Sequence, residues 1–310
     1  MKSIRSSIYI TACLTLTWLS IPAIGSVYCN EQGVRLEVLG SGELSFGTTR
    51  AAGSYLVWHN DRARVLINAG AGTYMRYKLS GANFNDLMAI VTTQTGIEQT
   101  ADLPSMLMAS LRSGRTEPLP IYGPSGNDSY PSISQLFERL ASEEGAYPEL
   151  SSFLSYSSPA GFRVRVRDVH PLARKHWGGF ANSELRLSAI VVQSGEIPSL
   201  AWRIDIGETA IVFTGEFSNQ RDIVADFAQG ASALVVSHRL PTGARGLPLD
   251  FYVTPEEIGR IAAKAEVKHV LLGSRGWRTF GRENATQETI AAAFAGPQLY
   301  ANEEECWGFQ

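Results

Sequence analysis

The chain has 310 residues, of which 44% are hydrophobic and 18% are charged. This composition is typical of a globular protein and excludes an intrinsically disordered chain. Lysine and arginine together number 27, against 30 aspartate and glutamate residues, which gives a formal net charge of −3. Because there is no basic excess to neutralise phosphates, a nucleic-acid partner is not expected.

Residues 1–25 have the features of a secretory signal peptide. A short basic start precedes a largely apolar run over residues 8–24. Ala23 and Gly25 place small residues at the −3 and −1 positions of a cleavage site. An uncleaved membrane anchor is the alternative, although Pro22 interrupts a run that is already short for a membrane span. We predict that residues 1–25 are removed and that the mature protein is secreted or periplasmic, with no membrane span.

The predicted strands and helices fall into two similar halves, each with strands first and helices after them. Short runs of β-branched and apolar residues predict strands, and apolar residues at helical spacing predict helices. The strands of the first half are expected at residues 34–39, 53–58, 64–67, 87–92 and 119–122. Its helices are expected at residues 73–79, 101–112 and 132–144.

The second half shows the same mixture of elements. Its strands are expected at residues 162–169, 185–192, 200–205, 209–213, 233–237 and 270–272. Helices are expected at residues 255–265 and 286–294, the first of them opened by a capping box of Thr254 and Glu257. Neither a low-complexity linker nor a short repeat separates the halves, so we predict one domain over residues 26–310.

Short motifs at the ends of the predicted strands carry a resemblance to a known family. In chain order they are LEVLGSG (36–42), AGSYLV (52–57), INAGAGT (67–73), AIVTT (89–93), GRTEPL (114–119), IYGP (121–124), IPSLAWR (197–203) and IVFTG (211–215). Their order and spacing resemble the metallo-β-lactamase superfamily, in its ribonuclease Z and arylsulfatase-like branch. The resemblance covers residues 34 to 294. It implies an α+β fold, a four-layer αββα sandwich, with two zinc ions between the sheet edges.

The resemblance also implies where zinc ligands should stand. Zinc lowers the pKa of a bound water to about 7 and polarises the scissile group. The family's ligands are a Thr-His-x-His-x-Asp-His run, a later histidine, an aspartate and a last histidine. This chain departs from the pattern at the corresponding places, which hold Gln94, Gly96, Glu98, Gln99, Ser194, Glu216 and Ser274.

The substituted residues do not form a zinc site by their chemistry. Glycine offers no ligand atom, and glutamine and serine offer only weak neutral oxygens, whereas zinc prefers imidazole, thiolate or carboxylate. Only Glu98 and Glu216 could still bind strongly. We therefore expect no metal and no other cofactor. We also expect these two carboxylates to repel each other across an empty site, so that replacing either by alanine leaves folding nearly unchanged.

We interpret the chain as an exported pseudoenzyme with a binding or regulatory role, and we assign no catalytic residue. Hydrogen-bonding groups are expected to line the former metal-site pocket: Gln94, Gly96, Glu98, Gln99, Asp102, Ser194, Glu216, Tyr252 and Ser274. They suit a neutral or weakly cationic small molecule or a loop of a partner protein. His238 is the one histidine that still matches the family pattern, and it is not normally a zinc ligand.

Three alternatives stay open. The chain could be an active metal-dependent hydrolase with a rewired site. Its activity would then be either that of a phosphodiesterase similar to ribonuclease Z or that of an arylsulfatase-like enzyme. It could be a recently inactivated gene copy. It could also be an interaction module that uses a flat face, which would be favoured if Arg275, Trp277 and their neighbours plug the cleft.

The mature chain keeps two cysteines, and we predict that they form one disulfide. Cys29 and Cys306 stand near the two ends, and an oxidising compartment favours pairing, whereas two unpaired thiols are the alternative. Apart from this bond, no sequence pattern predicts an anchor for residues 302–310. A loop this long would stabilise the protein by roughly 5 kcal/mol in the chain-entropy model. Peptide mapping without reduction should recover the joined pair, and two titratable thiols in the unfolded, unreduced protein would contradict the prediction.

Overall fold

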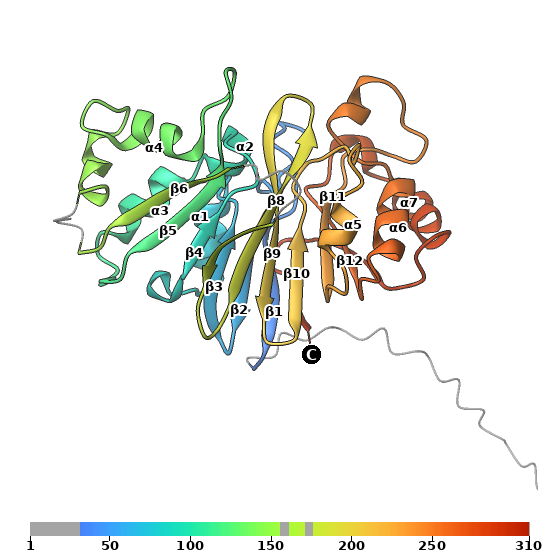
Figure 1. Cartoon of the computed structure of the whole chain (residues 1–310), viewed down its shortest axis with the longest axis horizontal. Helices are drawn as coiled ribbons and strands as arrows, with labels where there is room; N and C mark the ends of the chain where they lie inside the picture. The colour runs from blue at the N-terminus through green and yellow to red at the C-terminus, as the bar shows by residue number, and fades with distance from the viewer. Residues whose placement is uncertain (1–31, 156–160, 171–175, 310) are drawn as a thin grey trace, which may run out of the picture.

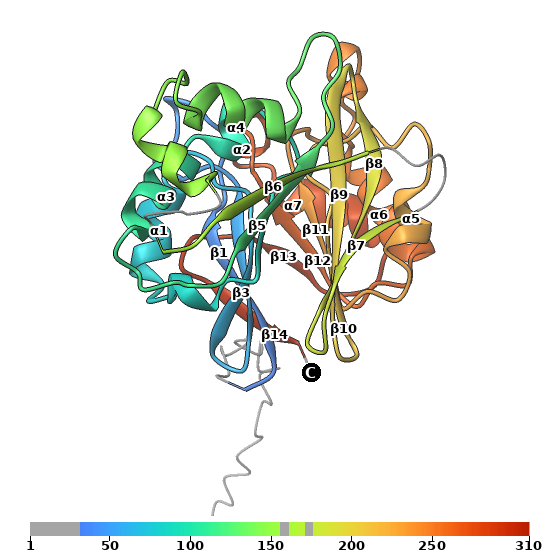
Figure 2. The same cartoon turned by 60° about the vertical axis from the view of Figure 1, so that its left-hand side comes forward.

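Two seven-stranded sheets pack face to face, and helices cover their outer faces (Figures 1 and 2). The computed structural model describes residues 32–155, 161–170 and 176–309. The predicted signal peptide and Cys29 lie outside the described residues, so export and the disulfide stay predictions. The αββα sandwich implied by the resemblance is confirmed.

The first sheet combines an antiparallel half with a parallel half. Its strands follow the order β14 (Cys306–Phe309), β1 (Val34–Gly40), β2 (Ser54–His59), β3 (Arg62–Ile67), β4 (Ala89–Val91), β5 (Leu119–Pro124) and β6 (Val164–Val169). Pairing is antiparallel from β14 to β3 and parallel from β3 to β6. The helices along this part of the chain are α1 (Thr73–Leu79), α2 (Ile97–Thr100), α3 (Leu103–Ser110) and α4 (Ile133–Ala141), with 3₁₀ turns η1 (Phe84–Asp86) and η2 (Pro148–Phe153).

The second sheet likewise combines an antiparallel half with a parallel half. Its strands follow the order β13 (Gln298–Tyr300), β12 (Val270–Gly273), β11 (Ala233–Ser237), β10 (Thr209–Phe213), β9 (Ile197–Ile206), β8 (Arg186–Ser194) and β7 (Trp177–Ala181). Pairing is antiparallel from β7 to β10 and parallel from β10 to β13. The associated elements are α5 (Val224–Phe227), α6 (Pro255–Lys264) and α7 (Glu283–Ala291), with η3 (Leu247–Asp250) and η4 (Trp277–Thr279). Among the described residues, no helix is both long and apolar enough to cross a bilayer.

Local sequence signals placed most elements within a few residues. The helix over 73–79 and the strands over 209–213 and 233–237 have the predicted bounds. Sequence patterns did not predict β7, β13 or β14. The last of these corrects the expectation for the C-terminus, because β14 pairs antiparallel with β1 and buries Trp307 and Phe309.

The capping box predicted at α6 is only half formed. Thr254 accepts a hydrogen bond from the backbone N–H of Glu257 at 3.5 Å. The Glu257 carboxylate does not return to the Thr254 N–H, because it binds Arg260 and Asn219 instead. A complete capping box occurs at α4, where Ser132 and Gln135 exchange side-chain and backbone hydrogen bonds.

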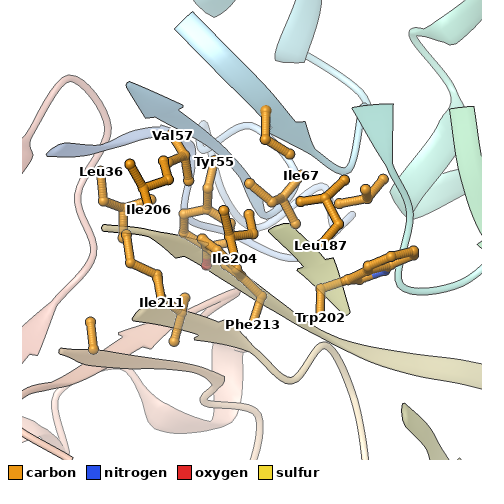
Figure 3. Packing of buried hydrophobic residues seen from close by; sticks show 14 of the residues in the cluster. Leu36, Tyr55, Val57, Ile67, Leu187, Trp202, Ile204, Ile206, Ile211 and Phe213 are labelled. Carbon is orange, nitrogen blue, oxygen red and sulfur yellow. The ribbon is translucent and has the colours of Figure 1, made fainter. Parts of the chain in front are cut away.

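The central core lies between the two sheets and is built from alternate residues of their strands (Figure 3). Trp202 on β9 is fully buried there and packs edge-on against Trp177 at a centroid distance of 5.7 Å. Its indole N–H donates to the Thr92 carbonyl, directly after β4, at 2.9 Å. The Leu200 N–H donates to the Thr93 carbonyl at 2.9 Å. These bonds fix the loop after β4 against the second sheet, which sets the geometry of the site described next.

Replacing Trp202 with alanine should destabilise the protein strongly. Truncating a buried aromatic side chain typically costs about 3–5 kcal/mol, and this change also leaves the buried Thr92 carbonyl without its donor. The matched control is Trp277→Ala, because Trp277 is 62% exposed and its loss should cost less than about 0.5 kcal/mol. Urea unfolding of both variants measures the difference. Similar losses in the two variants would contradict the central position of Trp202.

Candidate functional site

Loops from both sheets converge at one end of the sandwich. These loops follow strands β1, β3, β4, β10, β11 and β12. Each of these strands except β1 has at least one parallel neighbour. Carboxyl ends of parallel strands meet at the same sheet edge, which is where α/β proteins commonly place their sites. Residues from these loops line one small cavity. Among them are Asn68 after β3, Glu216 after β10 and Ser274 after β12.

A guanidinium group lies at the centre of this site. Arg239, which follows β11, donates from Nη1 to Glu43 Oε2 at 2.9 Å and from Nη2 to Glu216 Oε1 at 2.6 Å. Its Nη2 also donates to Glu98 Oε1. We call these four residues the guanidinium–carboxylate cluster. It joins a loop of the first sheet, helix α2 and two loops of the second sheet in one network.

Burial sets the electrostatics of the cluster. Arg239 is 5% exposed and Glu216 is 8% exposed. Burial lowers the pKa of Arg239, but the carboxylates of Glu216 and Glu98 raise it by more, so the guanidinium stays charged. Burial raises the pKa of Glu216, with Arg239 opposing the shift and Glu98 adding to it. One fixed cation therefore holds three converging carboxyl groups.

The same carboxylates also fix the loops that cover the site. The Leu44 N–H donates to Glu98 Oε1 at 3.1 Å, and the Trp277 N–H donates to Glu43 Oε1 at 2.8 Å. A further bond of 2.8 Å runs from the Arg275 N–H to the Ser41 carbonyl. The loop between β1 and β2 and the loop after β12 are thus tied to each other and to the cluster beneath them.

Two glycines allow the close approaches that the site requires. A Cβ atom at Gly70 would lie 1.9 Å from the backbone oxygen of Glu98, so only glycine lets the loop after β3 touch α2. Gly215 has a φ of 61°, a left-handed conformation that turns the chain directly before Glu216. Both glycines therefore permit the backbone arrangement next to Glu98 and Glu216.

Little space remains inside the site. The cavity measures about 20 Å³, which holds roughly one water molecule. Its lining includes Tyr55, Glu98, Glu216, Arg239 and Ser274. Tyr55 is hydrogen-bonded to Ser274, and burial raises its pKa to about 12. The site is filled by its own side chains.

The structure brings together four of the nine residues predicted to line the pocket. Glu98, Gln99, Glu216 and Ser274 border the cavity. The other five residues do not line the cavity, and their contacts are described next.

Gln94 donates from Nε2 to Ser199 Oγ at 2.9 Å, across the two sheets. Gly96 is the N-cap of α2. Asp102 accepts from the Tyr74 N–H at 2.8 Å and so holds α1 against α3.

Ser194 donates to the Phe251 carbonyl at 3.3 Å. Tyr252 is close enough to the cluster for Glu216 to raise its pKa, after burial as the larger cause. Neither residue lines the cavity.

Sequence reasoning missed Arg239 and Glu43, and it misjudged the charge of the site. The expectation that Glu98 and Glu216 repel each other across an empty site is wrong, because Arg239 lies between them. The available signal was an arginine two residues after the end of the buried strand β11, at a strand end that faces two unmatched carboxylates. Arg275 and Trp277, whose plugging of the cleft would have favoured an interaction module, do not line the cavity. Arg275 pairs with Glu283, and Trp277 is exposed, so Arg239 fills the space.

His238 supports the second helical layer and does not face the cavity. Its Nε2 lies 3.2 Å from Thr286 Oγ1 on α7. Burial, with a smaller effect of Arg275, lowers the pKa of His238 to about 4. The imidazole is therefore neutral at physiological pH and acts as a structural group.

The residues present do not fit the two zinc ions that the resemblance implies. In the part of the chain that the structure describes, no group of three or more His, Cys, Asp and Glu side chains is placed to hold a metal. Glu98 and Glu216, the two strong donors left at ligand places, both accept hydrogen bonds from Arg239. Amide and hydroxyl groups at the other places are weak zinc donors.

Comparison with known proteins gives the fold. Neither a protein-family model nor a curated protein sequence matches the chain. Solved structures do match. The metallo-β-lactamase fold protein YhfI from Bacillus subtilis is 19% identical, with a TM-score of 0.66 over 88% of this chain and 98% of its own.

Two enzymes match over similar lengths. The short form of human tRNase Z is 17% identical, with a TM-score of 0.66 over 88% of this chain and 98% of its own. A diphosphatase from the PhnP family is 16% identical, with a TM-score of 0.60 over 89% of this chain and 98% of its own. Identities this low establish architecture alone. The chain has the metallo-β-lactamase fold.

Proposed function

We propose that this protein is an exported, non-catalytic member of its fold group that acts by binding a partner protein. One observation carries the proposal: the Arg239 guanidinium occupies the interior of the site and binds three carboxylates. A tethered cation replaces the charge that a metal would supply. Unlike a metal ion, it has no open coordination position and cannot activate a water.

The size of the cavity favours a protein over a small molecule as the partner. Pockets for small molecules typically measure about 300–1,000 Å³. The cavity here holds about 20 Å³. A ligand would have to displace Arg239 from three carboxylates, which would leave the buried Glu216 and the partly buried Glu43 and Glu98 without a counter-ion.

The surface above the cluster offers the alternative binding face. Leu44, Ile97 and Trp277 are 52%, 69% and 62% exposed. The backbone of Leu44 and Trp277 is bonded to Glu98 and Glu43, and Ile97 precedes Glu98 on α2. Exposed apolar side chains on a fixed base are typical of protein-binding surfaces.

An active metal-dependent hydrolase with a rewired site is the second candidate. It draws on the neighbours named as tRNase Z and as a diphosphatase. The donor set of this chain argues against it. A decayed gene copy is also less favoured, because random loss of ligands would not place an arginine between the remaining carboxylates.

The purified mature protein should hold well under one zinc ion per chain after dialysis. It should show no phosphodiesterase, β-lactamase or sulfatase activity above background, because Arg239 holds the two remaining carboxylates. Metal analysis by mass spectrometry and substrate assays with added zinc measure both quantities. Stoichiometric zinc together with turnover that a chelator abolishes would establish the hydrolase instead.

Replacing Arg239 with methionine should destabilise the protein by about 3–5 kcal/mol at pH 7.5, because it leaves buried carboxylates without their counter-ion. The loss should shrink at acidic pH. A carboxyl group whose pKa is raised on folding stabilises the native state below its unfolded pKa, about 4.3, and this contribution disappears as the pH rises through the folded pKa. Denaturant unfolding at several pH values measures the effect.

Two further variants serve as controls for Arg239→Met. Arg239→Lys keeps the charge but loses the planar fork, so its loss should be intermediate. Adding Glu216→Gln to Arg239→Met should recover part of the stability, because it removes the most buried of the three charges. A loss below about 1 kcal/mol for Arg239→Met, independent of pH, would show that the cluster does not stabilise the fold.

A further inference from the structure

We propose that the groove between α1 and α3 binds an amphipathic carboxylate, an apolar chain with one anionic head group. The groove lies on the outer face of the first sheet and shares no lining residue with the cavity of the guanidinium–carboxylate cluster. It is therefore independent of the proposed function. Its volume is about 390 Å³, within the range of small-molecule pockets.

Two helical stripes form the walls of this groove. On α1, Tyr74, Tyr77 and Lys78 stand at positions i, i+3 and i+4 and share one helix face. On α3, Met106 and Ala109 share a face in the same way. Ser110, the last residue of α3, also lines the groove, and the remaining lining residues come from the segments that follow the two helices: Gly81, Ala82, Phe84 and Ser113.

The walls are suited to an apolar chain. Aromatic rings and a methionine dominate the lining, with small side chains between them. Three of the five methionines of the chain, Met75, Met106 and Met108, belong to these two helices. Methionine adapts its shape to irregular apolar ligands, and of these three Met106 lines the groove, while Met75 and Met108 are about half exposed elsewhere on the two helices.

The positive charge of Lys78 in the groove favours a ligand with an anionic head group. Lys78 is the one formally charged residue of the lining, and no carboxylate pairs with it among the described residues. Its ammonium lies 5.7 Å from the centre of the Tyr74 ring, which also lines the groove. An unpaired cation beside an apolar groove complements an anion that carries an apolar body.

The groove is held in shape from below. Asp102, the N-cap of α3, accepts a hydrogen bond from the Tyr74 N–H at the start of α1. The Tyr77 and Phe84 rings meet edge to face at 6.4 Å. A ligand would therefore meet walls that are already ordered, which lowers the entropic cost of binding.

Titration calorimetry with decanoate, below its micelle concentration, tests the proposal. Decanoate should bind saturably at one site per chain, whereas decyltrimethylammonium should not. Lys78→Met should weaken decanoate binding by about tenfold, the loss expected for one charge-assisted contact. Lys78→Glu should reverse the preference toward decyltrimethylammonium. Lys268→Met is the matched control, because Lys268 is an exposed lysine far along the chain from the groove.

A steric variant separates the groove from other binding modes. Ala109→Trp should abolish binding by filling the groove, and Ala263→Trp, at an exposed alanine of α6, is its control. Far-ultraviolet circular dichroism confirms folding of each variant. Equal binding of both head groups, or binding unaffected by Lys78→Glu and Ala109→Trp, would overturn the proposal. Association only with anionic phospholipid vesicles, without binding of monomeric decanoate, would also overturn it.

Discussion

A buried cation holds together the part of this fold where the two sheets would otherwise place acidic groups against one another. Arg239 and Glu216 lie on loops of the second sheet, while Glu43 lies on a loop of the first sheet and Glu98 on helix α2 beside it. Bringing one buried and two partly buried carboxyl groups together is unfavourable unless a positive charge is present. A protein of this architecture therefore needs a metal ion or a cationic side chain at this point, and this chain provides the side chain.

The cluster also organises its surroundings. Because Glu98 and Glu43 each accept a second hydrogen bond from backbone, the loops above the site depend on the same charges as Arg239. Loops that are usually mobile become a fixed cover. The bonds from Trp202 and Leu200 to the loop after β4 fix the floor in the same way. The position of each carboxylate is thus set by packing as well as by charge.

The elements that could be predicted from sequence are those whose signal is local. The apolar run over 233–237 forms β11, and the lost histidines are visible as Gln94, Gly96 and Gln99. The counter-ion could not be predicted in this way. Arg239 lies 141 residues from Glu98, and only the packing of the two sheets brings them together.

The strand β14 was missed for a similar reason. Its four residues follow an acidic, polar segment and resemble a tail, and their partner β1 lies at the opposite end of the chain. Local propensity is a weak guide to a short edge strand, because its stability comes from pairing and from the burial of Trp307 and Phe309. Long-range contacts of this kind leave no period in the sequence.

A covalently attached cation changes what the site can do, as well as what it contains. A metal ion can exchange ligands, accept water and release product, whereas a guanidinium has only its fixed N–H donors. Moving Arg239 outward would break its bonds to three carboxylates and expose charges that the fold has buried. Under the function proposed above, a partner would therefore be recognised at the outer surface above the cluster, where Leu44, Ile97 and Trp277 are exposed, and the groove between α1 and α3 is a separate candidate site.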